Sequence, residues 1–388
     1  MILTTGRQDY GILRSTILLL RRAPDFDAEV WAGGMHLQPR FGEPLAAFRA
    51  DGVPVARELP FLAEPPSPTA DTAEALRQIG AALAEAAPDA LVLVGDRAEA
   101  LAAGLAATLA GVPIVHLHGG EESEGAIDNA CRHALTKLSH LHLVSHPVHA
   151  ERVRRMGEDP ASIAVVGAPA MDNAYRDDLP ASAELAADLG VALEPPVVVV
   201  TVHPATLGGP AGEEVAAVAA AMERVPATYV ITAPNADAGS AEIAAFWRTW
   251  TEGRGRVVLV EALGERRYWA MLRLADAVLG NSSSGIIEAP VLGVPVVNVG
   301  DRQLGRLRYG PVTDVAAKTD AIAGALRAAL APGDAGGAGG IKRPRAVGID
   351  PSQDAGGYPT PPAAPRIVDA LRRWEIPRPP RKRFRDRG

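Results

Sequence analysis

The sequence predicts an α/β fold of two domains, each with a mostly parallel sheet flanked by helices. Short apolar runs alternate with longer helix-like stretches, which is the pattern of repeated strand and helix units. A chain of 388 residues is too long for one ordinary core, so two domains of roughly 150–200 residues are expected. A polar, proline-bearing stretch near residues 178–195 separates two series of such units, and we place the boundary there.

The first domain, residues 1–180, contains six predicted strands. Ala- and Leu-rich stretches between them, such as 72–86 and 98–110, are predicted helices. In chain order the strands are MILTT, AEVWAGG, ALVLVGD, PIVHLHG, LHLVSH and IAVVGA.

The second domain, residues 190–330, repeats this pattern. Its predicted strands are VVVVTVHP, TYVITAPN, VVLVEAL, AVLGNSS and PVVNVG. Residues 331–365 are rich in Gly, Pro and Ala and predict a long loop. Residues 366–388 predict a C-terminal helix followed by a basic tail, which is most often a solvated terminus.

Composition excludes several classes of protein. Apolar residues make up 47% and charged residues 22%, as in ordinary globular proteins, and no run of about 18 apolar residues predicts a membrane span. The first strand leads straight into a polar turn, unlike a signal peptide, and a lone cysteine, Cys131, suits a reducing compartment. We therefore expect a cytoplasmic protein. A net charge of −7 argues against binding nucleic acid.

Polar clusters follow the predicted strands of the first domain, at the edge where open parallel sheets bind ligands. GRQDYG follows the first strand, so Arg7 and the next helix's N-terminus are candidates for binding an anion, although a capped turn has the same pattern. In GDR, Asp96 is a candidate base or sugar ligand and Arg97 a partner for it or for a phosphate. The alternative is that Asp96 caps a helix.

The segment HLHGGEESEGAID (116–128) concentrates acidic residues and histidines after one strand and before a helix-like stretch. General acid–base chemistry is the better interpretation, with His118, Glu121, Glu124 and Asp128 as candidates. A metal site is the alternative, but no Cys and His framework completes it. Cys131 lies in the helix-like DNACRHALTKL, which favours a packed side chain over a nucleophile.

The second domain carries the sharpest motif, GNSSSG (280–285). Its small hydroxyl residues and glycines offer several N–H and O–H groups to one anion at a helix N-terminus, and a Ser-rich helix cap is the alternative. Glu288 is a candidate for binding the ribose hydroxyls, and Arg302 follows the next strand. His203 ends the domain's first strand before a proline and is either a site residue or a neutral core histidine.

Taken together, these segments resemble the UDP-N-acetylglucosamine 2-epimerases, closest to the hydrolysing branch that feeds sialic-acid-type pathways. The resemblance covers most of residues 1–310, and several motifs matching in order are far more specific than any one of them. In chain order they are RQDYG, AGGMHLQPRFG, GDR, HLHGGEESEGAID, RHALTKLSHLHLVSH, VVGAPAMDN, VTVHPAT, GNSSSGIIEAP and NVGDRQLGR.

The resemblance implies the GT-B glycosyltransferase-like fold: two Rossmann-like domains facing a central cleft that binds UDP, with the C-terminal helix crossing back. It also implies a homodimer or higher homo-oligomer, no redox cofactor and no metal. Asp96, Arg97 and Asp128 match family positions near the reacting sugar. Positions around the UDP moiety are matched by Arg7, His203, Asn235, Ser282, Ser283, Glu288 and Arg302, beside Ser284 and Gly285 of the same motif.

One departure leaves the catalytic base open. The family often has a catalytic Glu where this chain has His118, so His118 itself, Glu121, Glu122 or Glu124 are the candidates. The implied reaction couples removal of the sugar C2 proton to departure of UDP, through a 2-acetamidoglucal intermediate. It yields N-acetylmannosamine and UDP, or UDP-N-acetylmannosamine. A glycosyltransferase of the same fold and a non-catalytic UDP-sugar sensor are the alternatives, and both a sialic-acid-like and an antibiotic pathway stay open.

Overall fold

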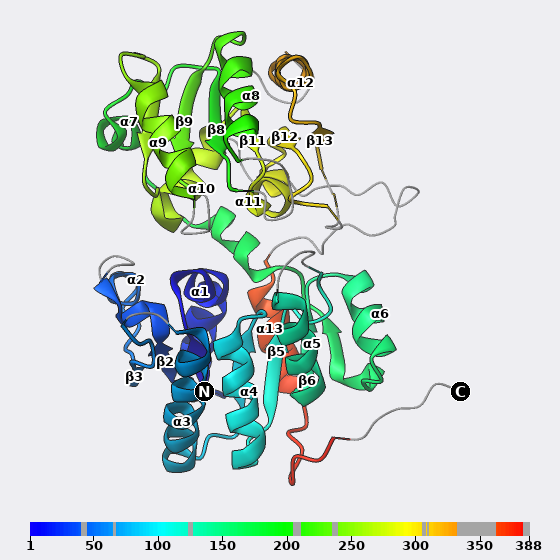
Figure 1. Cartoon of the computed structure of the whole chain (residues 1–388). Coiled ribbons are helices and arrows are strands. Elements are labelled where there is room, and N and C mark those ends of the chain that lie inside the picture. Colours follow the sequence, from blue (N-terminus) through cyan, green and yellow to red (C-terminus); the bar gives the residue numbers. More distant parts are fainter. Residues whose placement is uncertain are drawn as a thin grey trace. The chain divides into compact units, whose positions relative to one another are not determined.

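The chain divides into two compact units (Figure 1). The N-terminal unit contains Met1–Asn173 and the returning Pro351–Gly388, and the C-terminal unit contains Ala174–Asp350. The division falls a few residues before the boundary placed from the sequence. The computed structural model describes residues 1–39, 45–64, 67–122, 127–204, 211–234, 240–304, 308, 310–331 and 362–382, without the side chains of Arg7 and Ala211. Most of the predicted loop 331–365 and the end of the basic tail lie outside these ranges.

The N-terminal unit is built on a seven-stranded parallel sheet of order β3-β2-β1-β4-β5-β6-β7. All six predicted strands are present. The short β3 was not predicted, because the polar sequence REL buries only its leucine fully. The strands are β1 (Ile2–Thr4), β2 (Val30–Gly33), β3 (Arg57–Leu59), β4 (Leu91–Val94), β5 (Ile114–Leu117), β6 (Leu141–Val144) and β7 (Ile163–Val165).

Helices cover both faces of this sheet. One core packs α1 and α13 against the strands, and a second packs α3, α4 and Leu135 of α5 against the opposite side chains. The helices are α1 (Arg7–Arg22), α2 (Ala46–Ala50), α3 (Pro68–Ala86), α4 (Ala98–Ala110), α5 (Asp128–Leu138), α6 (Pro147–Arg155) and α13 (Ala364–Arg373).

The C-terminal helix α13 crosses back to the N-terminal unit, which confirms the prediction. Ile367 and Val368 are buried in the same core as α1. The buried Asp172 satisfies the start of the helix, because its two carboxylate oxygens accept hydrogen bonds from the backbone N–H groups of Ala363 (2.6 Å) and Ala364 (2.8 Å). The last residues of the segment 1–173 therefore hold the start of the helix with which the chain returns to this unit.

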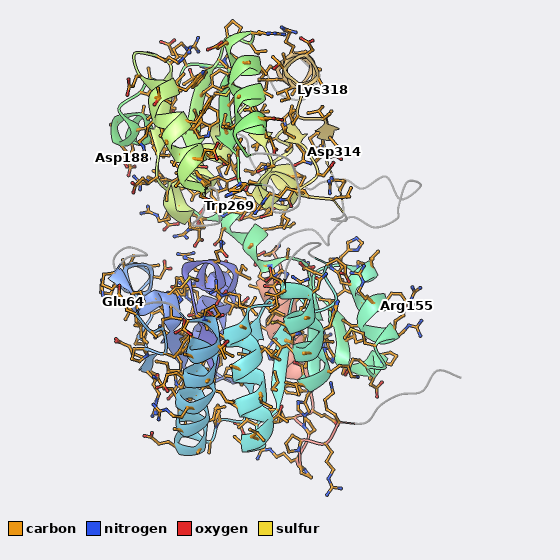
Figure 2. All side chains as sticks on the ribbon, viewed as in Figure 1. Glu64, Arg155, Asp188, Trp269, Asp314 and Lys318 are labelled. Carbon is orange, nitrogen blue, oxygen red and sulfur yellow. The ribbon has the colours of Figure 1, made fainter. Side chains whose placement is uncertain are left out.

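The C-terminal unit has a six-stranded parallel sheet of order β10-β9-β8-β11-β12-β13. All five predicted strands are present, and the edge strand β13 was missed because two of its four residues are exposed and polar. Figure 2 shows one of them, Asp314. The elements are α7 (Ser182–Leu189), β8 (Val197–Thr201), α8 (Ala211–Glu223), β9 (Thr228–Thr232), α9 (Ser240–Thr251), β10 (Val257–Val260), α10 (Gly264–Leu274), β11 (Ala277–Gly280), α11 (Ser283–Ile287), β12 (Val296–Val299), β13 (Val312–Val315) and α12 (Thr319–Leu330).

Both sheets reverse their strand order once. The reversal falls between β1 and β4 in the N-terminal unit and between β8 and β11 in the C-terminal unit. Loops that leave such a pair of strands diverge to opposite faces and open a crevice at the carboxyl edge, where doubly wound proteins bind ligands. The loops after these four strands are therefore the places to look for function. In the described part of the chain, no helix is long and apolar enough to cross a membrane.

Candidate active site

The loop after β1 begins with a buried carboxylate. Asp9 of α1 accepts hydrogen bonds from the backbone N–H (2.8 Å) and the hydroxyl (2.7 Å) of Thr5. Burial raises the pKa of Asp9, and the bonds from Thr5 and the charge of Arg97 oppose that effect. Arg7 is the first residue of α1, as the sequence predicts, and its side chain lies outside the described part of the structure.

Asp96 follows β4 across the reversal point and is paired with Arg132 of α5. Arg132 Nη2 donates to Asp96 Oδ2, and Arg132 Nη1 donates to the carbonyl of Glu121 (2.7 Å) and to Asn129 Oδ1 (2.9 Å). The Arg132 side chain is 3% exposed and that of Asp96 is 26% exposed. A buried cation therefore holds a partly open carboxylate at the carboxyl edge of the sheet.

Arg97 stands next to this pair and turns to α4. Its guanidinium donates to both carboxylate oxygens of Glu99, at 2.7 and 3.3 Å. Arg97 itself occupies the N-cap position of α4, where no side chain accepts a capping hydrogen bond. Asp96 is therefore not the helix cap that the alternative interpretation proposed.

His116 and His118 play different roles, because β5 ends at Leu117. His116 is fully buried and donates from Nε2 to the carbonyl of Gly95 (2.8 Å). Burial lowers the pKa of His116 to about 3, so this ring is neutral at physiological pH and ties β5 to the loop that carries Asp96. His118 takes a backbone φ of +64°, so the strand does not continue and the two rings do not share its face.

His118 is bonded to Glu121, three residues further on. Its Nδ1 lies 2.7 Å from Glu121 Oε1, and its Nε2 is buried without a hydrogen-bond partner among the described residues. A left-handed backbone at a residue other than glycine costs free energy, on the order of 1 kcal/mol, and such strain concentrates at functional sites. The direction of this imidazole is therefore set by a backbone conformation that lowers the stability of the loop.

Glu121 receives one further hydrogen bond, from Ser145 in the loop after β6, and Ser145 in turn contacts His149 of α6. Ser145 Oγ donates to the same oxygen, Oε1, at 2.5 Å, and His149 Nδ1 lies 2.9 Å from Ser145 Oγ. Burial alone would raise the pKa of Glu121, but His118, His149 and Ser145 outweigh it and hold the pKa well below its usual range. Burial also lowers the pKa of His149 to about 4. The group is a half-buried anion that is hydrogen-bonded to the His118 imidazole and the Ser145 hydroxyl and lies 3.9 Å from the His149 ring nitrogen.

Gly120 allows this loop to approach α6. Its φ is +76°, and a Cβ there would lie 2.5 Å from the backbone oxygen of His149. Arg152 of α6 donates to the Gly120 carbonyl, and its Nε lies 3.4 Å from Glu122. Gly120 thus serves close packing between the loop and α6.

The other acidic residues of the segment are placed less completely. Asp128 is the first residue of α5, in the turn where the helix dipole favours an anion. Glu122 accepts from Asn129 Nδ2 (2.7 Å), and Glu124 lies outside the described residues. Cys131 is buried on α5 and burial raises its pKa, which fits a packed side chain and not a nucleophile. Among the described residues, no group of three His, Cys, Asp or Glu is placed to hold a metal ion.

In the C-terminal unit the reversal point joins the loops after β8 and β11. Asn281 is fully buried and clasps His203: its Oδ1 accepts from the backbone N–H of His203 (2.7 Å) and its Nδ2 donates to the carbonyl (2.8 Å). Gly280 has a φ of +130°, and a Cβ there would fall 2.0 Å from the carbonyl oxygen of Thr201. Only glycine lets the two strand ends approach this closely.

The serines of GNSSSG lie at the start of the short helix α11. Ser282 is its N-cap and accepts from the backbone N–H of Ser284 (3.4 Å), while Ser284 Oγ contacts Tyr268 Oη of α10. The helix spans Ser283–Ile287, and Glu288 directly follows its last residue. Glu288 follows its end because a proline two residues later stops the regular α-helix. Burial raises the pKa of Glu288, and a hydrogen bond from Ser284 opposes it.

Arg302 reaches this loop from the segment after β12. Its Nη1 donates to the carbonyl of Asn281 (3.1 Å), and Gln303 Nε2 donates to the same oxygen at 2.8 Å. Glu214 of α8 accepts from Asn281 Nδ2 (3.0 Å), and burial raises its pKa against the nearby charge of Arg302. The structure thus joins His203, Ser282 and Arg302 through Asn281. Asn235, a predicted ligand, lies outside the described residues.

Several residues of the two clusters were not singled out from the sequence. Arg132 lies inside a quoted helical motif, and Ser145 directly follows a strand, as His118 does and Asp96 nearly does, so position alone could have pointed to it. Asn281 sits inside GNSSSG but was passed over for the serines. No sequence pattern announces contacts such as those of His149, Glu214 and Tyr268, which come from other helices.

Comparison with solved structures defines the class of fold. Over 96% of this chain and 98% of the other, the structure superposes on the UDP-GlcNAc 2-epimerase of Methanocaldococcus jannaschii solved in complex with UDP-GlcNAc and UDP, with a TM-score of 0.72 and 16% identity. At that identity the likeness shows the fold alone. The predicted α/β fold of two Rossmann-like, GT-B-like halves is confirmed.

Sequence comparison defines the family. Residues 19–372 match the UDP-N-acetylglucosamine 2-epimerase family, and the chain belongs to it. A Legionella pneumophila relative called UDP-N,N'-diacetylbacillosamine 2-epimerase (hydrolyzing) is 33% identical over 85% of this chain and 88% of its own. The Polysialic acid biosynthesis protein P7 of Escherichia coli is 31% identical over 83% of each chain.

Proposed function

We propose that the protein is a hydrolysing 2-epimerase of a UDP-linked 2-acetamido sugar, with UDP-N-acetylglucosamine or a closely related sugar as substrate. The observation that carries the proposal is the partly buried ionic cluster at the reversal point of the first sheet, in a chain of this family. There Arg132 holds Asp96, and Glu121 and His118 lie one strand away. A transferase that only moves a sugar to an acceptor has no need of such a set of acid–base groups.

The C-terminal unit is proposed to bind the UDP moiety. Ser282 and Ser283 lie partly exposed at the start of α11, at the edge of the sheet, and Arg302 supplies the positive charge. Glu288, partly exposed beside α11, is suited to accept from the ribose hydroxyls. Charge-assisted contacts to the diphosphate stabilise the leaving group as its negative charge grows, which is where the binding free energy assists the reaction.

The N-terminal unit is proposed to perform the chemistry. The C2 hydrogen of the sugar is weakly acidic, so its removal must accompany breakage of the C1–O bond. The C–H electron pair forms a C1=C2 double bond, and the C1–O pair leaves with UDP, by anti elimination. Protonation of the 2-acetamidoglucal at the other face of C2 and addition of water at C1 complete the inversion and release the manno sugar. Asp96, Arg97 and Asp128 are placed around the reacting sugar in this proposal.

The hydrolysing outcome is proposed because the Legionella relative carries that activity in its name and is 33% identical to this chain. Its named substrate, UDP-N,N'-diacetylbacillosamine, is a second candidate beside UDP-N-acetylglucosamine. Both share the 2-acetamido group and the UDP leaving group on which the mechanism depends.

The product spectrum tests the proposal. The protein is incubated separately with each UDP-sugar, and UDP release and the configuration of the sugar are followed by NMR. We expect free manno-configured sugar and stoichiometric UDP from at least one of them. A UDP-linked manno product would show a non-hydrolysing epimerase. Unchanged UDP-sugar in both reactions would contradict the proposal.

A further inference from the structure

The hydrogen bonds around Glu121 determine where each proton sits. An ionised carboxylate only accepts, so Ser145 gives its single hydroxyl hydrogen to Glu121 Oε1. The contact of 2.9 Å between Ser145 Oγ and His149 Nδ1 then requires His149 to donate. By the same reasoning His118 donates from Nδ1 to Glu121 at 2.7 Å. The chain of contacts leaves one arrangement of hydrogens.

In that arrangement the unprotonated nitrogen of a neutral His118 is Nε2. Free imidazole side chains favour the opposite tautomer, with the hydrogen on Nε2, so the bond to Glu121 selects the less common form. Nε2 is buried and has no partner among the described residues. It therefore keeps a lone pair that nothing in the described structure uses.

We propose that His118 is the base that removes the C2 proton, and that Ser145 and His149 act as positioning residues that fix its tautomer through Glu121. The inference deepens the proposed function and rests on it. The C2 proton moves to Nε2, its electron pair forms the C1=C2 bond, and UDP leaves with the C1–O pair. The imidazolium that forms lies against the Glu121 carboxylate, which stabilises it.

Charged and titratable groups from the neighbouring helices also lie near Glu121 and His118. From α5, Arg132 donates to the carbonyl of Glu121, and it is itself neutralised by Asp96. From α6, Arg152 is bonded to the Gly120 carbonyl and lies near Glu122. His146, which caps α6, stacks edge-on with His149 at a ring distance of 5.6 Å. Each arginine has an acidic neighbour, so Glu121 is left as the anion that faces His118.

The first test replaces His118 by Asn. The Asn amide keeps a donor near the position of Nδ1 and tolerates a φ of +64°, but it offers nothing in place of Nε2. With UDP-N-acetylglucosamine in deuterated water, we expect His118→Asn to lose C2 exchange and UDP release by about 10²–10⁴-fold, with KM within a few-fold of wild type. The matched control is His140→Asn at the opposite edge of the sheet, where Asn keeps the acceptor for the N–H of Ile114.

The second test addresses the positioning residues. Ser145→Ala removes the hydroxyl that links His149 to Glu121. We therefore expect kcat to fall with KM unchanged, and the acidic side of the plot of kcat against pH to move. Ser145→Thr, which keeps the hydroxyl, should restore both. In ¹⁵N-histidine NMR of the substrate-free protein, His118 should carry its hydrogen on Nδ1 in the wild type and lose that preference in Ser145→Ala.

The outcomes separate the two proposals. A wild type that exchanges C2 while His118→Asn exchanges as fast overturns the role of His118 and leaves the epimerase intact. A neutral His118 with its hydrogen on Nε2 in the wild type overturns the positioning role of Ser145 and His149. A wild type that neither exchanges C2 nor releases UDP with either of the two candidate UDP-sugars contradicts the proposed function and, with it, the assignment of the base.

Discussion

The side-chain amide of Asn281 clasps the backbone of His203 from both sides, accepting from its N–H at 2.7 Å and donating to its carbonyl at 2.8 Å. The clasp joins the loops after β8 and β11, the two strands at which the second sheet reverses its order. It therefore determines how the residues predicted to bind the nucleotide lie relative to one another.

Replacing Asn281 by Ala should weaken UDP binding on the order of tenfold, because the His203 N–H and carbonyl lose buried partners, each worth about 1–3 kcal/mol when left unpaired. Isothermal titration with UDP measures the affinity. Asn298→Ala is the matched control, since this buried amide on β12 bonds Asp314 and not the loop. Equal losses in the two variants would mean that the clasp has no specific role.

Arg302→Ala should weaken UDP binding by about 1–3 kcal/mol, the usual scale for a charge-assisted hydrogen bond. Arg302 reaches the loop through the Asn281 carbonyl. Arg308→Ala removes a nearby arginine that pairs with Asp314 and should leave the affinity unchanged. An Arg302 variant that binds UDP as the wild type does would refute the placement of the diphosphate.

Asp96→Asn should abolish turnover and leave UDP affinity nearly intact. The amide still offers an oxygen to Arg132, so the fold persists, but the carboxylate that faces the sugar in our proposal is gone. Steady-state rates and titration with UDP measure the two effects. Asp89→Asn, a change to an exposed residue paired with Arg378, should alter neither. Loss of UDP binding in Asp96→Asn would show that Asp96 is structural.

The fold could be read from the sequence because parallel strands covered on both faces are nearly continuous apolar runs. VVVV of β8 and LVLV of β4 are fully buried and were recognised without difficulty. The edge strands β3 and β13 were missed since a partly exposed strand loses that pattern.

The candidate site was readable only in part, for a physical reason. Residues directly after strands, such as Asp96 and His203, share one edge by topology, so their spacing along the chain predicts their grouping. The partners that set their charge come from helix faces, where Arg132 and His149 look like ordinary helical residues. Which proton sits on which nitrogen of His118 depends on three such partners at once, and no linear pattern encodes that.

Acid should destabilise the N-terminal unit through His116. The pKa of this ring falls from 6.5 to about 3 on folding, with burial as the main cause. Above pH 6.5 both states are neutral and nothing is lost. Between pH 6.5 and 3 the unfolded chain binds the proton and the folded one does not, so stability falls by up to about 1.4 kcal/mol per pH unit. The variant His116→Gln keeps a donor for the Gly95 carbonyl. In chemical unfolding across this pH range, its free energy of unfolding should depend less steeply on pH than that of the wild type. An unchanged slope would exclude His116 as the cause.

Gly280→Ala should destabilise the C-terminal unit by about 3 kcal/mol, because a Cβ there meets the Thr201 carbonyl and the φ of +130° suits only glycine. Gly324→Ala on α12 is the control: no atom lies within 4 Å of its Cβ, so it should stabilise the helix by about 0.5–1 kcal/mol. Thermal unfolding followed by tryptophan fluorescence compares them. Shifts in the same direction would contradict the close approach of β8 and β11.

The central claim is that the protein inverts C2 of a UDP-linked 2-acetamido sugar by removing and returning its proton. The most direct measurement incubates the wild-type protein with UDP-N-acetylglucosamine in deuterated water, without any acceptor, and follows C2 by NMR and mass spectrometry. We predict one deuterium at C2 of a manno-configured product, formed together with UDP. A manno product without deuterium, or no reaction with either this sugar or UDP-N,N'-diacetylbacillosamine, would contradict the account.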